Sequence, residues 1–166
     1  MRARRSPLPV LAACAALVVA ASLFASAAAH AYLEGAEPAP GSVHVGVVEV
    51  LTLRYTTPVE PRFSSFELYR LDLPEGAVPA DPAAPSPRDL QRIEALAARF
   101  AGEVRDGTHD VDTRIASHLR ESAGSRTITL DLDAPLAPGV YVLLWEVLAS
   151  DGHTTRDHHV FLVVDA

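Results

Sequence analysis

The side chains best suited to chemistry in this chain are its seven histidines, because sulfur ligands are almost absent. They are His30, His44, His109, His118, His153, His158 and His159. The only cysteine is Cys14 and the only methionine is Met1. A metal site in the rest of the chain must therefore use imidazole, carboxylate and backbone nitrogen, a donor set that suits Cu(II), Ni(II) and Zn(II).

Asp151 and His153 form one candidate pair of ligands. They lie two residues apart in the segment SDGHT, directly after an apolar segment. Alternate residues of an extended chain point to the same side, and Gly152 lets the backbone bend between them. One carboxylate and one imidazole could thus reach a single ion. Asp-Gly is also a common turn, so the pair alone is a weak signal.

His30 joins this pair only if it is the first residue of the mature chain. Residues 1–29 begin with three arginines, continue with an uncharged apolar run and end in ASAAA, which predicts a cleaved secretory signal peptide rather than a retained membrane anchor. Cleavage after Ala29 leaves a domain of residues 30–166 that starts with His30. Its α-amine, with an ordinary pKa of about 7.7–8.0, and its ring nitrogen can then chelate one metal. Cleavage after Ala31 also satisfies the small-residue rule, and it would remove His30.

The charge of the mature domain limits its partners. All three arginines of the leader are lost on cleavage, which leaves 11 basic residues against 21 acidic ones, a net charge of about −10. Such a surface argues against nucleic acid as a partner and is compatible with a cation. The length suits one hydrophobic core, and without a cysteine the domain has no disulfide.

Short β-strands are the elements that must position these residues. Apolar residues alternate within residues 46–61, 63–71, 126–139 and 140–153, and residues 158–166 form a last strand. In residues 140–153 both faces are apolar, so we expect this strand to be central. Strands separated by proline and glycine turns predict an all-β sandwich or barrel.

Residues 72–126 interrupt this pattern, and we interpret them as a helical insertion between two strands. A Pro/Ala-rich segment is followed by a helix signature with Ser86 as N-cap, Pro87 at the first helical position and Asp89 three residues after the cap. The apolar residues that follow at helical spacing are Leu90, Ile93, Ala97 and Phe100. A second short helix is expected within residues 110–124, because Val111, Ile115 and Leu119 are four residues apart.

Four segments resemble one known family and occur in the same order as in that family: HAYLEGAEPAPGS, LTLRYTTPVEP, LAPGVYVLLWEVLASDGH and the terminal FLV. Together they resemble the CopC/PcoC family of exported copper-resistance proteins. The Pro-Gly-x-Tyr-x-x-x-Trp strand that runs into Ser-Asp-Gly-His is the most specific part. The resemblance implies a Greek-key (immunoglobulin-like) β-sandwich. It also implies one Cu(II) per chain, bound by the amine and ring of His30, by Asp151 and by His153.

The resemblance also implies a role. We expect a periplasmic protein that sequesters Cu(II) or hands it to a CopD-like inner-membrane importer, is not membrane-embedded once its leader is removed, is a monomer and is not an enzyme. Three departures from the family pattern matter, and one of them is that the insertion at residues 72–126 is longer than is usual in the family. The methionine-rich Cu(I) site of some members has no counterpart here, and Thr57 stands where glutamate commonly precedes Pro-Val.

Two other functions remain open. An N-terminal histidine and a second histidine on a β-sandwich also form the copper site of lytic polysaccharide monooxygenases. Against this reading, Asp151 would fill a position that oxygen activation needs, and the chain has few aromatic residues for a polysaccharide platform. The third possibility is a metal-free interaction domain of immunoglobulin-like shape.

The remaining histidines are expected to lie outside the copper site. His158 and His159 are neighbours on the last strand and face opposite ways, so we expect His158 to be exposed and His159 to be half-buried. His109 and His118 are expected to be solvated, with at most a weak accessory copper site at each. We expect His44 at the surface and Trp145 in the core.

Overall fold

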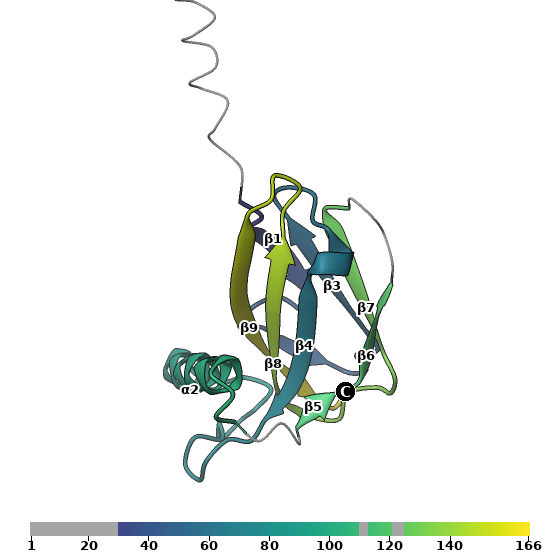
Figure 1. Ribbon diagram of the computed structural model, residues 1–166. Coiled ribbons are helices and arrows are strands. Elements are labelled where there is room, and N and C mark those ends of the chain that lie inside the picture. The colour runs from purple at the N-terminus through teal and green to yellow at the C-terminus, as the bar shows by residue number, and fades with distance from the viewer. Residues whose placement is uncertain (1–29, 110–112, 121–124) are drawn as a thin grey trace, which may run out of the picture.

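Two packed β-sheets form the structure, a computed structural model that describes residues 30–109, 113–120 and 125–166 (Figure 1). The first sheet has the strand order β1 (Leu33–Glu37), β3 (Val50–Tyr55), β7 (Thr127–Leu132), β6 (Ser117–Arg120). The second has the order β2 (Val43–Val45), β9 (Thr154–Val164), β8 (Gly139–Leu148), β4 (Ser65–Leu71), β5 (Arg114–Ile115). Neighbouring strands are antiparallel, except that β2 runs parallel to β9. The predicted all-β sandwich is confirmed.

The main core fills the space between the two sheets, as the alternating pattern predicts. Leu51, Leu53 and Tyr55 of β3 are almost fully buried, and the residues between them are not. They belong to the same apolar cluster as Tyr141 and Trp145 of β8. Trp145 is therefore a core residue, as expected, and its ring meets that of Tyr55 edge to face with 5.4 Å between centroids.

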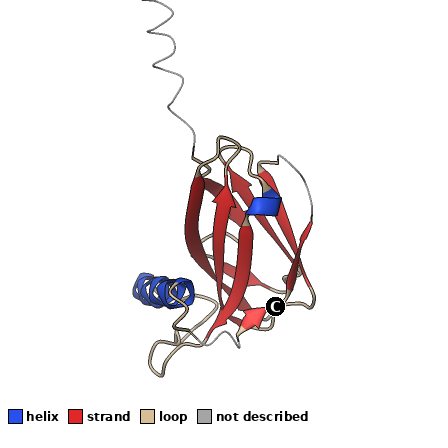
Figure 2. Ribbon diagram, viewed as in Figure 1, coloured by secondary structure: helices blue, strands red, loops and turns tan. Residues whose placement is uncertain are grey.

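Strand β8 contributes to two cores because it is covered on both faces. Its other face, with Val142 and Leu144, packs beneath α2 (Pro87–Arg105) together with Ile93 and Phe100 of that helix. Figure 2 shows the helix lying outside the sandwich, on the side of the five-stranded sheet. β8 pairs with β9 on one side and β4 on the other, so the predicted central position is confirmed.

Helix α2 begins where its sequence signature predicts. The Ser86 hydroxyl accepts a hydrogen bond from the backbone N–H of Asp89 at 3.2 Å, and the Asp89 carboxylate accepts one from the backbone N–H of Ser86 at 3.1 Å. This reciprocal capping box satisfies two N–H groups that otherwise lack partners at a helix start. In the order of the chain the helix follows β4 and precedes β5, so the predicted helical insertion between two strands is confirmed for residues 87–105.

The prediction of a second short helix within residues 110–124 is wrong for the part that the structure describes. Residues 114–115 and 117–120 form β5 and β6, short edge strands of the two different sheets. A spacing of four residues fits two strand repeats as well as about one helical turn, and here Ile115 and Leu119 both pack against the core between the sheets. Val111 lies outside the described residues. Two further edge strands, β1 and β2, have no counterpart in the predicted elements.

The predicted signal peptide of residues 1–29 also lies outside the described residues. Within the described ranges, no helix combines the length and the apolar character needed to cross a membrane. A short 3-10 helix, η1 (Pro61–Phe63), follows β3 and contacts β8 at the end of the sandwich where the described chain begins. The candidate metal ligands gather at this end.

Candidate metal centre

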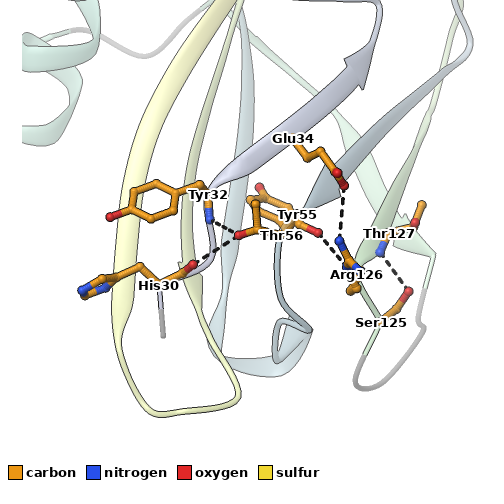
Figure 3. A network of polar contacts seen from close by, with 8 residues as sticks. All are labelled: His30, Tyr32, Glu34, Tyr55, Thr56, Ser125, Arg126 and Thr127. Carbon is orange, nitrogen blue, oxygen red and sulfur yellow. Dashed lines mark hydrogen bonds and ion pairs between the residues drawn. The ribbon is translucent and has the colours of Figure 1, made fainter. Parts of the chain in front are cut away.

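The segment that carries His30 is fixed to the sandwich through its backbone. Ala31 is completely buried in the main core, and its carbonyl oxygen accepts a hydrogen bond from the Thr155 hydroxyl at 2.6 Å. The Thr56 hydroxyl donates to the carbonyl oxygen of His30 at 3.2 Å and accepts from the backbone N–H of Tyr32 at 3.0 Å (Figure 3). His30 is therefore held at a defined place on the end of the sandwich while its side chain remains exposed.

A second set of contacts supports Thr56 from behind. Arg126, directly before β7, donates from Nε to the carbonyl oxygen of Tyr55 at 3.0 Å and from Nη2 to the Glu34 carboxylate at 3.3 Å (Figure 3). The backbone N–H of Tyr55 in turn donates to the carbonyl oxygen of Arg126 at 2.8 Å. Strands β1, β3 and β7 are thus joined beside the residue that anchors His30.

The turn between β8 and β9 positions Asp151 and His153. Gly152 has φ +87°, in the left-handed region that a residue with a Cβ atom rarely adopts, and its N–H donates to the carbonyl oxygen of Ala149 at 2.9 Å. The backbone N–H of His153 donates to Asp151 Oδ1 at 3.0 Å, which closes the turn around the aspartate. The expected proximity of Asp151 and His153 is confirmed, but a tight turn produces it rather than an extended segment.

The two histidines meet at this end of the fold although 122 positions separate them in sequence. The rings of His30 and His153 contact each other edge to face, with 4.9 Å between centroids and an angle of 71° between planes. Tyr32, 61 % exposed, lies on the other side of the His30 ring with its centroid 6.0 Å away. The sequence-predicted set of His30, Asp151 and His153 is therefore brought together.

Electrostatics favours an ionised Asp151 and an oriented His153. The backbone N–H of His153 has the largest effect on the pKa of Asp151 and holds it below its ordinary value. Burial, the second-largest effect, opposes this, and the rings of His153 and His30 lower the pKa further. Asp151 Oδ2 lies 3.1 Å from His153 Nδ1. Because an ionised carboxylate only accepts hydrogen bonds, this contact requires the proton on Nδ1 and leaves Nε2 free for a metal.

The side chains alone do not form a finished metal cage. Within residues 30–109, 113–120 and 125–166, no group of three or more His, Cys, Asp and Glu side chains is arranged to hold a metal ion. The donor set still fits copper if a further nitrogen comes from the main chain at His30, because amine and imidazole nitrogens suit Cu(II). The Thr57 hydroxyl is buried and has no hydrogen-bond partner among the residues that the structure describes.

The other histidines have their own surroundings. His118 is well exposed and pairs with Asp133 at 2.9 Å, as expected for a solvated residue. His44 is half-buried at the surface, 3.7 Å from Glu37. The expectation for His109 is wrong, because its ring packs on Phe100 of α2 with 4.3 Å between centroids and its side chain is only 26 % exposed.

His158 and His159 face opposite sides of β9, as predicted, but both are more buried than expected. The side chain of His158 is only 12 % exposed, because α2 covers that face of the strand and brings Glu94 within 3.4 Å of Nε2. His159 points into the sandwich beside Phe161 and is 5 % exposed. Burial, with a smaller effect of His158, lowers its pKa to about 4. Neither ring faces the candidate site residues.

Sequence reasoning missed the residues that anchor the site. Thr56 and Thr155 hold His30 and Ala31 through backbone groups, and neither residue type nor spacing distinguishes them from other threonines. The only available signal is position: Thr56 directly follows β3, and Thr155 lies two residues after His153.

Comparison with known proteins gives a family match in the second half of the chain. Residues 117–164 match the CopC domain family. Protein YobA of Escherichia coli K12 is 28 % identical over 81 residues, which cover 49 % of this chain and 65 % of YobA, and the Shigella flexneri YobA protein matches equally. The aligned region thus spans slightly less than two thirds of these relatives.

Solved structures share the fold. PcoC, a methionine-rich copper resistance protein from Escherichia coli, superposes with a TM-score of 0.55 at 18 % identity, over 82 % of this chain and 100 % of PcoC. CopC from Methylosinus trichosporium OB3b superposes with a TM-score of 0.53 at 21 % identity, over 82 % of this chain and 95 % of that protein. The matched segment runs from β6 to β9 and includes Asp151 and His153. Residues 117–164 are thus similar to the CopC domain, and the structure shares the β-sandwich fold of PcoC and CopC.

Proposed function

We propose that this protein is an exported copper-binding protein that binds one Cu(II) per chain at His30, Asp151 and His153. The observation that carries the proposal is the contact between the rings of His30 and His153, which come from opposite ends of the domain sequence. Two imidazoles that converge beside a carboxylate at an exposed surface supply the donor types that Cu(II) prefers. The domain match and the fold shared with copper resistance proteins support copper as the ion.

Each residue has a distinct part in the proposed site. His30 supplies its ring nitrogen and, once the peptide bond that precedes it is cleaved, its α-amine. His153 supplies Nε2, because its Nδ1 faces the carboxylate of Asp151. Asp151 orients that ring and contributes negative charge next to the ion. Direct coordination by Asp151 requires its carboxylate to release Nδ1.

The oxidation state follows from the available donors. Cu(I) prefers thiolate and thioether ligands, and the chain has neither Cys nor Met beyond residue 14. Nitrogen and carboxylate ligands suit Cu(II). The protein would therefore bind Cu(II) alone, unlike a methionine-rich relative.

The exposed position of the site suits storage and transfer. His30 is exposed, and the side chains of His153 and Asp151 are 58 % and 29 % exposed. A partner can approach the metal without a conformational change in the sandwich. We propose that the protein acts as a monomer in the periplasm, sequesters Cu(II) there and passes it to a CopD-like inner-membrane importer rather than catalysing a reaction.

Copper titration of protein that begins at His30 tests the proposal. Competition with a Cu(II) chelator should give one tight site per chain. His153→Ala should weaken it by at least about 100-fold, because even substitutions of outer-shell partners commonly cost ~10–100-fold in metal affinity. His118→Ala is the matched control, since it removes an exposed histidine remote from the site and should leave the affinity unchanged. Equal affinities for both variants would refute the proposal.

The enzyme alternative has its own test. The copper-loaded protein with ascorbate should show no sustained peroxide formation and no cleavage of glycans. Robust turnover that depends on His30 and His153 would instead make the site a redox centre.

A further inference from the structure

A cavity of about 480 Å³ lies at the end of the sandwich opposite to His30. Its floor is formed by Leu71 at the end of β4, Val140 near the start of β8 and Leu162 near the end of β9. All three belong to the apolar core beneath α2. The loop between β4 and α2 forms its other wall with Val78, Pro79, Pro82 and Ala83. In Figure 1 this loop lies below α2, at the lower end of the sheets. The volume is within the range of about 300–1,000 Å³ typical of small-molecule sites.

The loop wall is fixed by specific contacts. Ala77 is buried, and the Arg92 guanidinium of α2 donates to the carbonyl oxygen of Gly76 at 2.6 Å. Asp81 closes a turn, because its Oδ1 accepts from the backbone N–H of Ala83 at 3.0 Å and its carbonyl oxygen accepts from Ala84. The cavity is therefore preformed, which reduces the entropy lost when a ligand binds.

The charge around the opening is mainly negative. Asp72, Asp81 and Asp165 are exposed lining residues, and among the described residues none of their carboxylates has an Arg or His partner within ion-pair distance. Among the described residues that line the cavity, Arg70 is the one cation, and its Nη2 donates to the carbonyl oxygen of Pro138 at 3.2 Å. An apolar floor beneath three carboxylates that lack an ion-pair partner among the described residues, and one guanidinium that is hydrogen-bonded to a carbonyl oxygen, is complementary to a molecule with an apolar body and a positively charged group.

We propose that this cavity binds a small organic cation, an amine or quaternary ammonium compound with an apolar body. The apolar part occupies the space above Leu71, Val140 and Leu162, and the cationic group lies at the opening among Asp72, Asp81 and Asp165. The site is separate from the copper site, because the 11 residues of β9 run from beside His153 to the cavity, about 35 Å at ~3.3 Å per residue. Binding of this cation does not depend on whether His30 binds copper.

Titration with a pair of ions that share an alkyl chain tests the proposal. We would add decyltrimethylammonium or decanesulfonate, below their micelle concentrations, to the metal-free exported protein labelled with nitrogen-15. Backbone amide shifts should move at Leu73, Val140 and Val163 for the cation and not at His153. The sulfonate should bind at least tenfold more weakly. Equal binding of both ions, or shifts scattered over the surface, would overturn the proposal.

Two kinds of variant separate the cavity from the general negative charge of the protein. Ala83→Trp places a large side chain at an exposed lining position and should abolish the shifts. Asp81→Asn and Asp165→Asn should each weaken binding about two- to fivefold, the effect of losing one exposed ion pair. The asparagine amide oxygen can still accept from the Ala83 N–H, so the turn is kept. Glu49→Gln removes the same charge outside the cavity and should have no effect. If Glu49→Gln weakens binding as much as the two aspartate variants do, or Ala83→Trp leaves binding intact, the cavity is not the site.

Discussion

Thr56→Val should weaken copper binding without touching a proposed ligand. The Thr56 hydroxyl accepts from Tyr32 N–H at 3.0 Å and donates to the His30 carbonyl oxygen at 3.2 Å. Valine has nearly the same shape but can make neither hydrogen bond. The segment would then keep the anchor at Ala31 and lose the two bonds from the Thr56 hydroxyl to the peptide groups on either side of Ala31.

The size of the effect follows from these two bonds. An intramolecular hydrogen bond contributes about 0.5–1.5 kcal/mol net, and both bonds here are exposed, so water replaces part of each. Loss of both bonds should destabilise the anchored conformation of His30 by about 1–2 kcal/mol and so reduce the population of molecules that are ready to bind copper. This corresponds to a copper affinity about 5–30-fold weaker. The global stability should change little, because the contacts lie at the end of the chain outside the core.

A chelator competition at fixed pH measures the affinity of the wild type, Thr56→Val and Thr56→Ser. The serine variant keeps the hydroxyl and should bind copper within about threefold of the wild type, a difference of less than ~0.7 kcal/mol. Thermal unfolding of the metal-free proteins reports whether the valine variant remains folded. If valine, serine and wild type bind copper equally well, the positioning role of Thr56 is refuted. If serine is as weak as valine, the hydroxyl is not the cause.

Four substitutions test the rest of the structure. Ser86→Ala should lower the free energy of unfolding by about 1 kcal/mol in a urea titration, because the capping box of α2 is lost; an unchanged midpoint would contradict the cap. Burial lowers the pKa of His159 to about 4, so the unfolded wild-type chain binds this proton more readily than the folded one. The free energy of unfolding of the wild type should therefore fall by up to about 3 kcal/mol as the pH drops from about 6.5 towards 4. His159→Phe should remove this pH dependence. This would be contradicted if the difference in free energy of unfolding between the wild type and His159→Phe were the same at pH 4.5 and pH 7.5. Gly152→Ala should destabilise by roughly 1 kcal/mol because of the positive φ, whereas Gly102→Ala, in the open interior of α2, should stabilise by about 0.5–1 kcal/mol. Unfolding midpoints that shift in the same direction for both glycines would contradict the assigned backbone conformations.

The sequence predicts the central strands because their burial follows the strand period. Leu51, Leu53 and Tyr55 alternate with polar residues, and β8 is apolar on both faces. The edges are harder to predict. β1 contains a glycine and an irregular register at Leu33–Gly35, and β2 has only three residues. In residues 114–120 the spacing of four fits both helix and strand, and only pairing with β4 and β7 decides between them.

The candidate site is only partly predictable from sequence. The turn at Gly152 brings Asp151 to His153 by local geometry, and the sequence indicates that pairing. The approach of His30 depends on the whole sandwich, since Thr56, which follows β3 of one sheet, and Thr155, in β9 of the other sheet, must bind the same short segment. No spacing rule covers 122 intervening positions, so the sequence indicates this pair only through its donor chemistry and the family resemblance.

The most direct test of the account is the Cu(II) affinity of two proteins that differ by one residue at the start. One begins at His30, and the other retains Ala29, so that the nitrogen of His30 is an amide rather than an amine. If the His30 amine binds the metal, the retained alanine should weaken binding by at least about 100-fold, beyond what the loss of an outer-shell contact costs, although every side chain is unchanged. Equal affinity of the two proteins would contradict the proposed site.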